Sequence, residues 1–274
     1  MNADERSIAI PATDGREASG PHELTGLARG PWQEDAAHGG APAGLLARAA
    51  ESLGADENLR LASISLAFNG PVFLGEVEVR AEVVKPGRRQ RVVAVAIDAG
   101  GRTLIEGRAV LIRRGEVDLP DGVKVSEDSW PGPDKGRPIE KELWADGDSD
   151  AFHRTSNTVV AIEGGPDRIG TTGMVWIRLD YPLVPGEELT GAQRAVAAAD
   201  FGNGVAHPVG WGDFLFINCD LNVSLLREPT GEWIGLESRT EVDANGSGLT
   251  TTRLHDANGH FGNASQILFV DRAA

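Results

Sequence analysis

The sequence holds a single cysteine, Cys219, among 274 residues. One thiol cannot form an internal disulfide, and zinc sites that need two or four cysteines are excluded as well. This cysteine usage fits a reducing compartment, so we expect a cytoplasmic protein. The six histidines are scattered, and no two have the spacing of metal ligands on one helical face. We therefore expect no metal site.

Basic residues are scarce relative to acidic ones. Lys and Arg number 26 against 41 Asp and Glu, which gives a net charge of −15. Most of such a surface repels phosphate, so we expect no nucleic acid partner. The sequence also lacks the phosphate-binding motifs G-x-G-x-x-G and G-x-x-x-x-G-K-[ST]. We therefore expect no nucleotide cofactor, nor any other cofactor.

Long apolar runs are missing too. No run approaches the ~18 residues that a membrane-spanning helix needs, so we expect no membrane span. Residues 1–20 are polar and acidic, without the basic and apolar segments of a secretory signal. We interpret residues 1–20 as a flexible N-terminal arm.

Residues 21–114 predict one helix followed by an antiparallel meander. Apolar residues from Leu45 to Leu53 recur on one helical face that is rich in Ala and Gly, and Gly54 ends the pattern. Such a helix can lie very close to whatever covers it. Alternating patterns and Gly, Pro and Asn turns predict four strands, at 59–68, 76–85, 91–98 and 103–113.

Residues 115–145 are rich in Pro and Gly and predict a surface linker. Residues 146–274 then repeat the scheme. An Ala-rich helix is predicted from Leu189 to about Asp200, with strands at 152–163, 173–180, 214–226, 232–242, 248–255 and 261–270. The turn at 98–101 matches the turn at 256–259, and the same offset pairs Arg108 with Gln266. Two thin helix-plus-sheet copies indicate a fused pseudo-dimer.

The predicted class is α+β, and the pattern resembles the tandem (double) hotdog fold. That fold implies two antiparallel sheets, each wrapping a long Ala/Gly-rich helix. Over residues 31–271 the chain also resembles the thioesterase-like superfamily related to acyl-CoA thioesterase II. The matching motifs are Trp32 with His38-Gly39-Gly40, Ala198-Ala199-Asp200-Phe201-Gly202-Asn203-Gly204, Arg227-Glu228-Pro229 with Gly231-Glu232-Trp233, and Asp256 and Gly259 with Ala264-Ser265-Gln266.

The resemblance implies an enzyme that hydrolyses an acyl-CoA or related acyl thioester. In that family a helix-borne Asp, a last-strand Gln and a Thr or Ser hold the attacking water. Asp200 matches the Asp and Gln266 matches the Gln, but the third position falls on Asn218. An amide can bind water, yet it is not a hydroxyl.

The residues themselves allow this chemistry. No G-x-S-x-G motif occurs and Cys219 lies in a predicted strand, which favours a carboxylate base over a covalent nucleophile. Asp200 ends a helix of small residues, and Phe201 and Gly202 follow as candidate substrate-binding residues. The same Asp could equally begin a simple turn. Gln266 is a lone amide in an apolar strand, where it needs a partner unless it faces outward.

Strict alternation predicts that Asn218 shares one strand face with Asp220, Asn222 and Ser224, either as solvent-exposed residues or beside Gln266. His38, Gly39 and Gly40 open the first predicted helix, where N–H groups are free. The Gly40 N–H is a candidate donor to a substrate carbonyl oxygen, with His38 beside it. The glycines could equally serve close helix packing.

The phosphates of coenzyme A would need a local basic patch on this acidic protein. Five arginines are candidates for it, although they could equally be ordinary surface residues: Arg88, Arg89, Arg91, Arg113 and Arg114.

Two other functions stay open. Asn218, in place of the Thr or Ser of the family, favours a non-catalytic protein that binds acyl or other hydrophobic ligands. A hotdog hydratase or dehydratase acting on acyl thioesters would need an Asp–His or His–Glu arrangement, and we identify no well-placed D-x₄-H pattern. Double hotdogs commonly pair through sheet edges, so a homodimer is expected.

Overall fold

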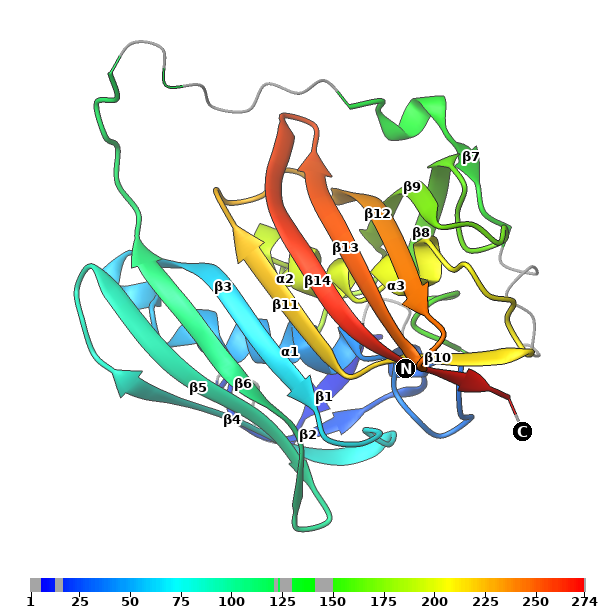
Figure 1. Ribbon diagram of the computed structural model, residues 1–274. Coiled ribbons are helices and arrows are strands. Elements are labelled where there is room, and N and C mark those ends of the chain that lie inside the picture. The colour runs from blue at the N-terminus through cyan, green and yellow to red at the C-terminus, as the bar shows by residue number, and fades with distance from the viewer. Residues whose placement is uncertain (1–5, 13–16, 121–122, 124–129, 141–149, 274) are drawn as a thin grey trace.

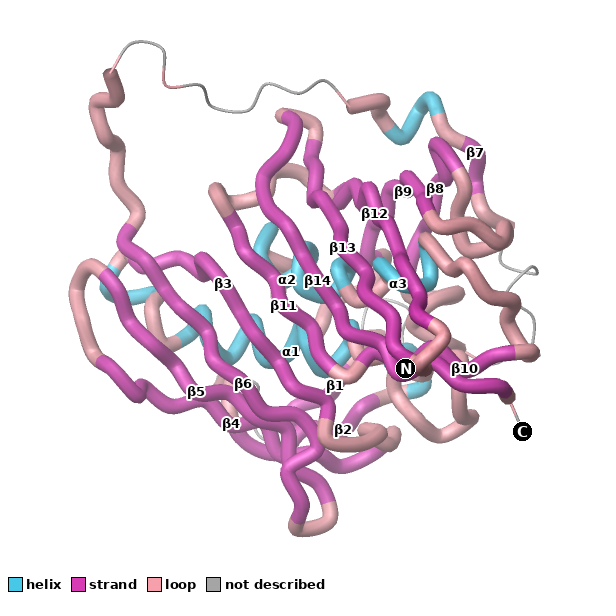
Figure 2. The backbone as a smooth tube through the Cα atoms, in the orientation of Figure 1, coloured by secondary structure: helices cyan, strands magenta, loops and turns pink. Residues whose placement is uncertain are grey.

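The computed structural model describes residues 6–12, 17–120, 123, 130–140 and 150–273. The two main helices lie side by side against one face of a large curved antiparallel sheet (Figures 1 and 2). The helices are α1 (Gly40–Ser52), α2 (Gly191–Ala199) and α3 (Gly202–Val205). The strands are β1 (Ala9–Pro11), β2 (Gly20–Leu24), β3 (Leu59–Phe68), β4 (Gly75–Lys85), β5 (Gln90–Ala99), β6 (Arg102–Arg113), β7 (Arg137–Pro138), β8 (Asn157–Glu163), β9 (Thr172–Leu179), β10 (Phe214–Asn218), β11 (Asp220–Leu225), β12 (Trp233–Asp243), β13 (Ser247–Asp256) and β14 (Gly259–Arg272).

Most predicted elements are confirmed, and local chemistry explains their ends. The first helix ends at Ser52, just before Leu53 and Gly54, and carries Pro42 in its first turn, where no N–H is needed. Thr190 caps α2 through a capping box, in which its side chain accepts from the Gln193 N–H and the Gln193 side chain reaches back. The second helix begins at Gly191, two residues later than predicted, because Thr190 is its cap, and it ends with Asp200 as the C-terminal cap before the chain resumes as α3.

The two predicted sheets are not distinct in the structure but continuous with each other. The strands of both halves join in one sheet in the order β1-β2-β4-β5-β6-β3-β11-β14-β13-β12-β9-β8-β7, with β10 also paired to β14. The junction is an antiparallel pairing of β3 with β11, in which Ser65 lies opposite Asn222. Because the two halves share this ladder, the edge of neither sheet is left open at the seam.

Small residues allow the two helices to pack closely, as the sequence predicted. A Cβ on Gly40 would lie 2.4 Å from the Ala197 carbonyl oxygen, and one on Gly44 would lie 3.3 Å from the Ala197 Cβ. The start of α1 therefore lies against the end of α2. Within the described part of the chain, no helix is long and apolar enough to cross a membrane.

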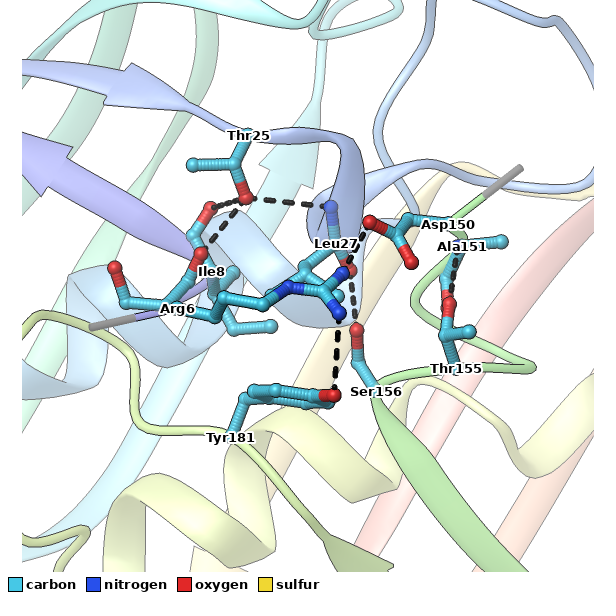
Figure 3. Close-up of polar contacts among 10 residues, drawn as sticks. Arg6, Ile8, Thr25, Leu27, Asp150, Ala151, Thr155, Ser156 and Tyr181 are labelled. Carbon is cyan, nitrogen blue, oxygen red and sulfur yellow. Dashed lines mark hydrogen bonds and ion pairs between the residues drawn. The ribbon is translucent and has the colours of Figure 1, made fainter. Parts of the chain in front are cut away.

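The N-terminal segment is not a loose arm where the structure describes it. Ile8 and Ala9 are fully buried, and their N–H groups donate to the carbonyls of Pro182 and Leu183. Figure 3 shows Arg6 between Asp150 and the Tyr181 hydroxyl, with Thr25 donating to the main chain beside it. Residues 6–12 thus bind the first half of the chain to the second.

The linker prediction also needs correction at its end. Trp130 stacks on His255 with ring centroids 4.6 Å apart and meets Trp176 edge-on at 4.7 Å. Residues 137–138 then form β7, the last strand of the sheet. The part from Trp130 to Ile139, which we call the strap, therefore belongs to the second half. The rest of the predicted boundary, at 141–149, lies outside the described residues.

Candidate active site

A cavity of about 480 Å³ lies where the two halves meet, beside the start of α1 and the end of α2. Five of the predicted site residues line it: His38, Gly39, Asp200, Phe201 and Asn218. Gly40, Gly202 and Gln266 are not among its lining residues. Larger grooves of about 780 and 660 Å³ cross the outer face of the sheet and are lined mostly by outward-pointing strand residues. We place the site in the smaller cavity, because it is apolar and holds convergent polar groups.

Asp200 is the C-terminal cap of α2, and its carboxylate is held from two sides. Its Oδ1 accepts from Asn218 Nδ2 at 2.7 Å, and its Oδ2 lies 2.8 Å from His38 Nδ1. The side chain is buried yet lines the cavity. A Cβ on Gly39 would lie 2.9 Å from Oδ2, so glycine at this position makes room for the carboxylate.

One ring nitrogen of His38 has two polar neighbours. Nδ1 lies 2.8 Å from Asp200 Oδ2 and 3.1 Å from the Gly40 N–H, which is directed at it. A nitrogen cannot accept from one partner and donate to the other at once. In the tautomer with hydrogen on Nδ1 the ring donates to Asp200, and in the other tautomer Nδ1 accepts from the Gly40 N–H.

The structure directs the Gly40 N–H at His38 Nδ1 and leaves Gly40 outside the cavity lining. Its role as a donor to a substrate carbonyl oxygen therefore stays a prediction. The alternative of close helix packing fits Gly40 better, because the Ala197 carbonyl leaves no room for a side chain. The His38 ring stacks on Phe201 at 4.5 Å and meets Phe152 at a tilt at 5.2 Å.

Asn218 reaches Asp200 because the strand changes register at Cys219. Asn218 of β10 lies opposite Leu268, whereas Asn222 of β11 lies opposite Ser265. The chain therefore advances by four residues from Asn218 to Asn222 while β14 advances by three. Phe216 and Asn218 therefore face the helices, and beyond the bend Leu221 and Val223 do so. The prediction that Asn218 shares a face with Asp220 and Asn222 is wrong. This bulge aims the amide into the cavity.

Gln266 is buried but does not contact the Asp200 carboxylate through any hydrogen bond of the described structure. Its Nε2 donates to the Asp200 carbonyl oxygen at 3.3 Å, and its Oε1 accepts from the Asn203 N–H at 3.3 Å. The amide therefore braces the break between α2 and α3. Gly202 is needed here, since a Cβ would lie 2.8 Å from Gln266 Oε1 and 2.7 Å from Thr252 Oγ1.

The internal repeat is displaced by one residue from the sequence alignment. Ala99 pairs with Arg102 across the first hairpin turn, as Asp256 pairs with Gly259 across the second. The position equivalent to Gln266 is therefore the buried Ala109, and not the exposed Arg108. The two halves still differ chemically here, as predicted.

His153 is a cavity-lining residue that the sequence analysis did not single out. It lines the cavity, and its ring centroid lies 6.5 Å from that of His38. Burial, with His38 and Arg154 nearby, lowers the pKa of His153 to about 3, so the ring stays neutral near pH 7. No periodic pattern marks this position, which follows the Pro/Gly-rich region.

None of the arginines suggested for coenzyme A phosphates lines the cavity. Arg91 pairs with Glu57, and Arg114 pairs with Glu228. Among the described residues that line the cavity there is no Lys or Arg. Across the same described ranges, no group of three or more His, Cys, Asp or Glu side chains is placed to hold a metal ion.

Family comparison agrees with this two-part architecture. Residues 28–112 match the acyl-CoA thioesterase N-terminal domain, and residues 125–270 match the acyl-CoA thioesterase C-terminal domain. The chain belongs to the acyl-CoA thioesterase family. Both halves of this thioesterase-like double hotdog are represented, and the second match begins close to the strap. No curated protein sequence matches the chain.

Solved structures share the fold of this family member at low identity. A conserved protein of unknown function with a hot dog fold from Alicyclobacillus acidocaldarius is 14% identical, with a TM-score of 0.73 and full coverage of both chains. The tesB protein of Mycobacterium avium subspecies paratuberculosis is 15% identical, with a TM-score of 0.64, covering 92% of this chain and 93% of its own. An acyl-CoA thioesterase II, TesB2, from Mycobacterium marinum is 14% identical, with a TM-score of 0.62, covering 93% and 94%.

Proposed function

We propose that the protein hydrolyses an acyl thioester in the 480 Å³ cavity, with Asp200 as the group that activates water. The observation that carries the proposal is the Asp200 carboxylate, which faces an apolar cavity while His38 and Asn218 fix its two oxygens. Family membership supports an acyl-CoA thioester as the substrate. A fixed carboxylate in an apolar cavity is suited to general-base catalysis.

The steps follow from these positions. Asp200 takes a proton from a water, whose oxygen attacks the thioester carbonyl and forms a tetrahedral intermediate. The carbon–sulfur bond then breaks, and the leaving thiolate receives the proton, which leaves a carboxylic acid and a thiol. Asn218 gives one N–H to Asp200, and its second N–H can donate to the water or to the carbonyl oxygen. Gln266 acts through the main chain of Asp200 and Asn203.

The test is thiol release from a panel of acyl-CoAs and of the matching acyl N-acetylcysteamine thioesters. Asp200→Asn keeps the shape and removes the base, so we expect a loss of about 100-fold or more in kcat/KM. The Cys219→Ser variant is the control for a covalent thiol route, since Cys219 also lines the cavity, and should stay near wild type. Full activity in Asp200→Asn would overturn the role of Asp200.

The His38–Asp200 contact favours a second candidate function, the hydration or dehydration of an acyl thioester. The two residues are far apart in the sequence, but the fold brings their side chains together from different halves at 2.8 Å. Such a pair can move a proton at two neighbouring carbons. Loss of enoyl-thioester absorbance without thiol release would select this function over hydrolysis.

A further inference from the structure

An aromatic cluster forms one wall of the cavity, with residues from both halves of the chain. Trp32 comes from the loop before α1, and Trp211 comes from the loop between α3 and β10. Their ring centroids lie 5.1 Å apart, and both rings contact Phe216, at 5.1 and 4.5 Å. Trp211 remains 37% exposed, so part of its ring is open to a ligand.

The cluster is held in place from behind. His207 is buried; its Nδ1 lies 3.1 Å from the Val209 carbonyl and its Nε2 lies 3.2 Å from the Pro166 carbonyl. Its ring is parallel to that of Phe216 and lies 5.7 Å from that of Trp211. Asn203 donates to the Phe216 carbonyl at 3.2 Å. The tryptophan wall is therefore built on fixed side chains, which suits recognition of a fixed shape.

The rest of the apolar lining combines rings with branched aliphatic side chains. Its rings are Phe68, Phe201 and three prolines, Pro31, Pro42 and Pro71, its aliphatic side chains include Val72, Ile105, Leu215 and Ile217, and no Met occurs among the described lining residues. Flexible aliphatic side chains adapt to a linear acyl chain, whereas flat rings favour a planar ligand. The described lining contains no Lys or Arg, so it offers no counter-ion to an acyl group with a second carboxylate.

We propose that this cavity selects an uncharged acyl group that carries an aromatic ring, with Trp32 and Trp211 as specificity-determining residues. The inference rests on the proposed thioester hydrolysis and names its substrate class. Stacking adds to area burial only when the ligand ring is aromatic. A cyclohexyl ring of similar size thus separates stacking from simple filling of the cavity.

The experiment compares three acyl-CoAs with nine acyl carbons: 3-phenylpropanoyl, 3-cyclohexylpropanoyl and nonanoyl. We expect kcat/KM for the phenyl compound to exceed the other two by about 3- to 10-fold. Trp32→Leu and Trp211→Leu should abolish this ratio, and Trp211→Phe should keep most of it. Trp233→Leu is the matched control, because Trp233 stacks on Arg178 outside the cavity lining.

Binding separates this inference from the proposed reaction. Calorimetric titration uses the three N-(2-acetamidoethyl) amides, in which nitrogen replaces the thioester sulfur and no hydrolysis occurs. Preferred binding of the phenyl amide that depends on Trp211, without any thiol release from the thioesters, would support the aromatic preference and reject hydrolysis. Hydrolysis with equal kcat/KM for all three acyl groups, unchanged in both Leu variants, would overturn the aromatic preference and retain the hydrolase.

Discussion

At the scale of single residues, the position of Asn218 decides how Asp200 is held. Asn218 and Asn222 lie on the same stretch of chain, but the bend at Cys219 turns them to opposite faces. Sequence alternation assigned them to one face, because a one-residue bulge leaves no mark in a pattern of period two. The two asparagines therefore form a matched pair for mutation.

Asn218→Ala should lower kcat by about 10- to 100-fold, because it removes the hydrogen bond that fixes Asp200 Oδ1. Asn222→Ala should leave kcat within about twofold, since Asn222 contacts Ser65 and Asp220 on the outer face. Steady-state thiol release on both variants checks the prediction. Equal losses would mean that the bend does not separate their roles.

Gly39→Ala tests the space beside the carboxylate. The Gly39 backbone is α-helical, with φ −56°, so alanine should not weaken the fold. Its Cβ would lie 2.9 and 3.1 Å from the two Asp200 oxygens and should displace them, with an expected loss of tenfold or more in kcat. Gly204→Ala is the control in the same cavity, because its Cβ meets only the Trp211 ring at 3.7 Å. A normal kcat for Gly39→Ala would refute the argument.

His153 should make stability depend on pH. Burial lowers its pKa from 6.5 to about 3, so the unfolded chain binds more protons between these values and stability falls as the pH is lowered through them. From pH 7 to pH 5 this group should cost about 2 kcal/mol of unfolding free energy. In His153→Gln the difference between urea unfolding at the two pH values should shrink by about that amount. An unchanged difference would contradict a neutral, buried His153.

At the scale of elements, the strap shows how a segment without periodicity becomes part of the sheet. Trp130 covers Gly235 of β12, where an added Cβ would lie 2.0 Å from the ring. Its Pro/Gly-rich surroundings predicted a surface linker, because composition reports local flexibility and not the contacts of one aromatic ring. The helices and most strands, in contrast, follow from periodicity that burial on one face enforces.

The Trp130–Gly235 contact predicts a non-additive mutant cycle. Trp130→Ala should lower the free energy of unfolding by about 2–3 kcal/mol, because a half-buried ring is lost. Gly235→Ala should cost a similar amount by displacing the ring, and the double variant should be no less stable than Trp130→Ala alone. Denaturant unfolding of the four proteins gives the coupling. Additive losses would show that the two sites do not interact.

At the scale of the whole molecule, the two halves form one folding unit. The β3–β11 ladder joins their strands, the two helices pack on each other, and one core cluster contains residues of both halves. The site depends on the same union, because His38 comes from the first half and Asp200 from the second. Neither half alone brings this pair together.

We therefore expect one cooperative unfolding transition. Of the six tryptophans only Trp32 lies within residues 1–114, so tryptophan fluorescence reports mostly on the rest of the chain, whereas far-ultraviolet circular dichroism reports on both halves. The two curves should coincide in denaturant. Residues 1–114 expressed alone should show no cooperative transition, because the β3 edge and the glycine face of α1 lose their partners. Two separated transitions would show that the halves fold independently.

The sequence by itself determined the helices, most strands, the twofold repeat and the family, because these depend on local periodicity and on motifs contiguous along the chain. It also named Asp200, His38 and Asn218 as candidates. Tertiary structure decided how they meet: the single sheet, the bend that turns Asn218 inward, and the Gln266 amide on the main chain instead of the carboxylate. Each depends on register and packing between segments at least 63 residues apart or on a one-residue bulge. Neither of these physical causes leaves a signal in composition or periodicity.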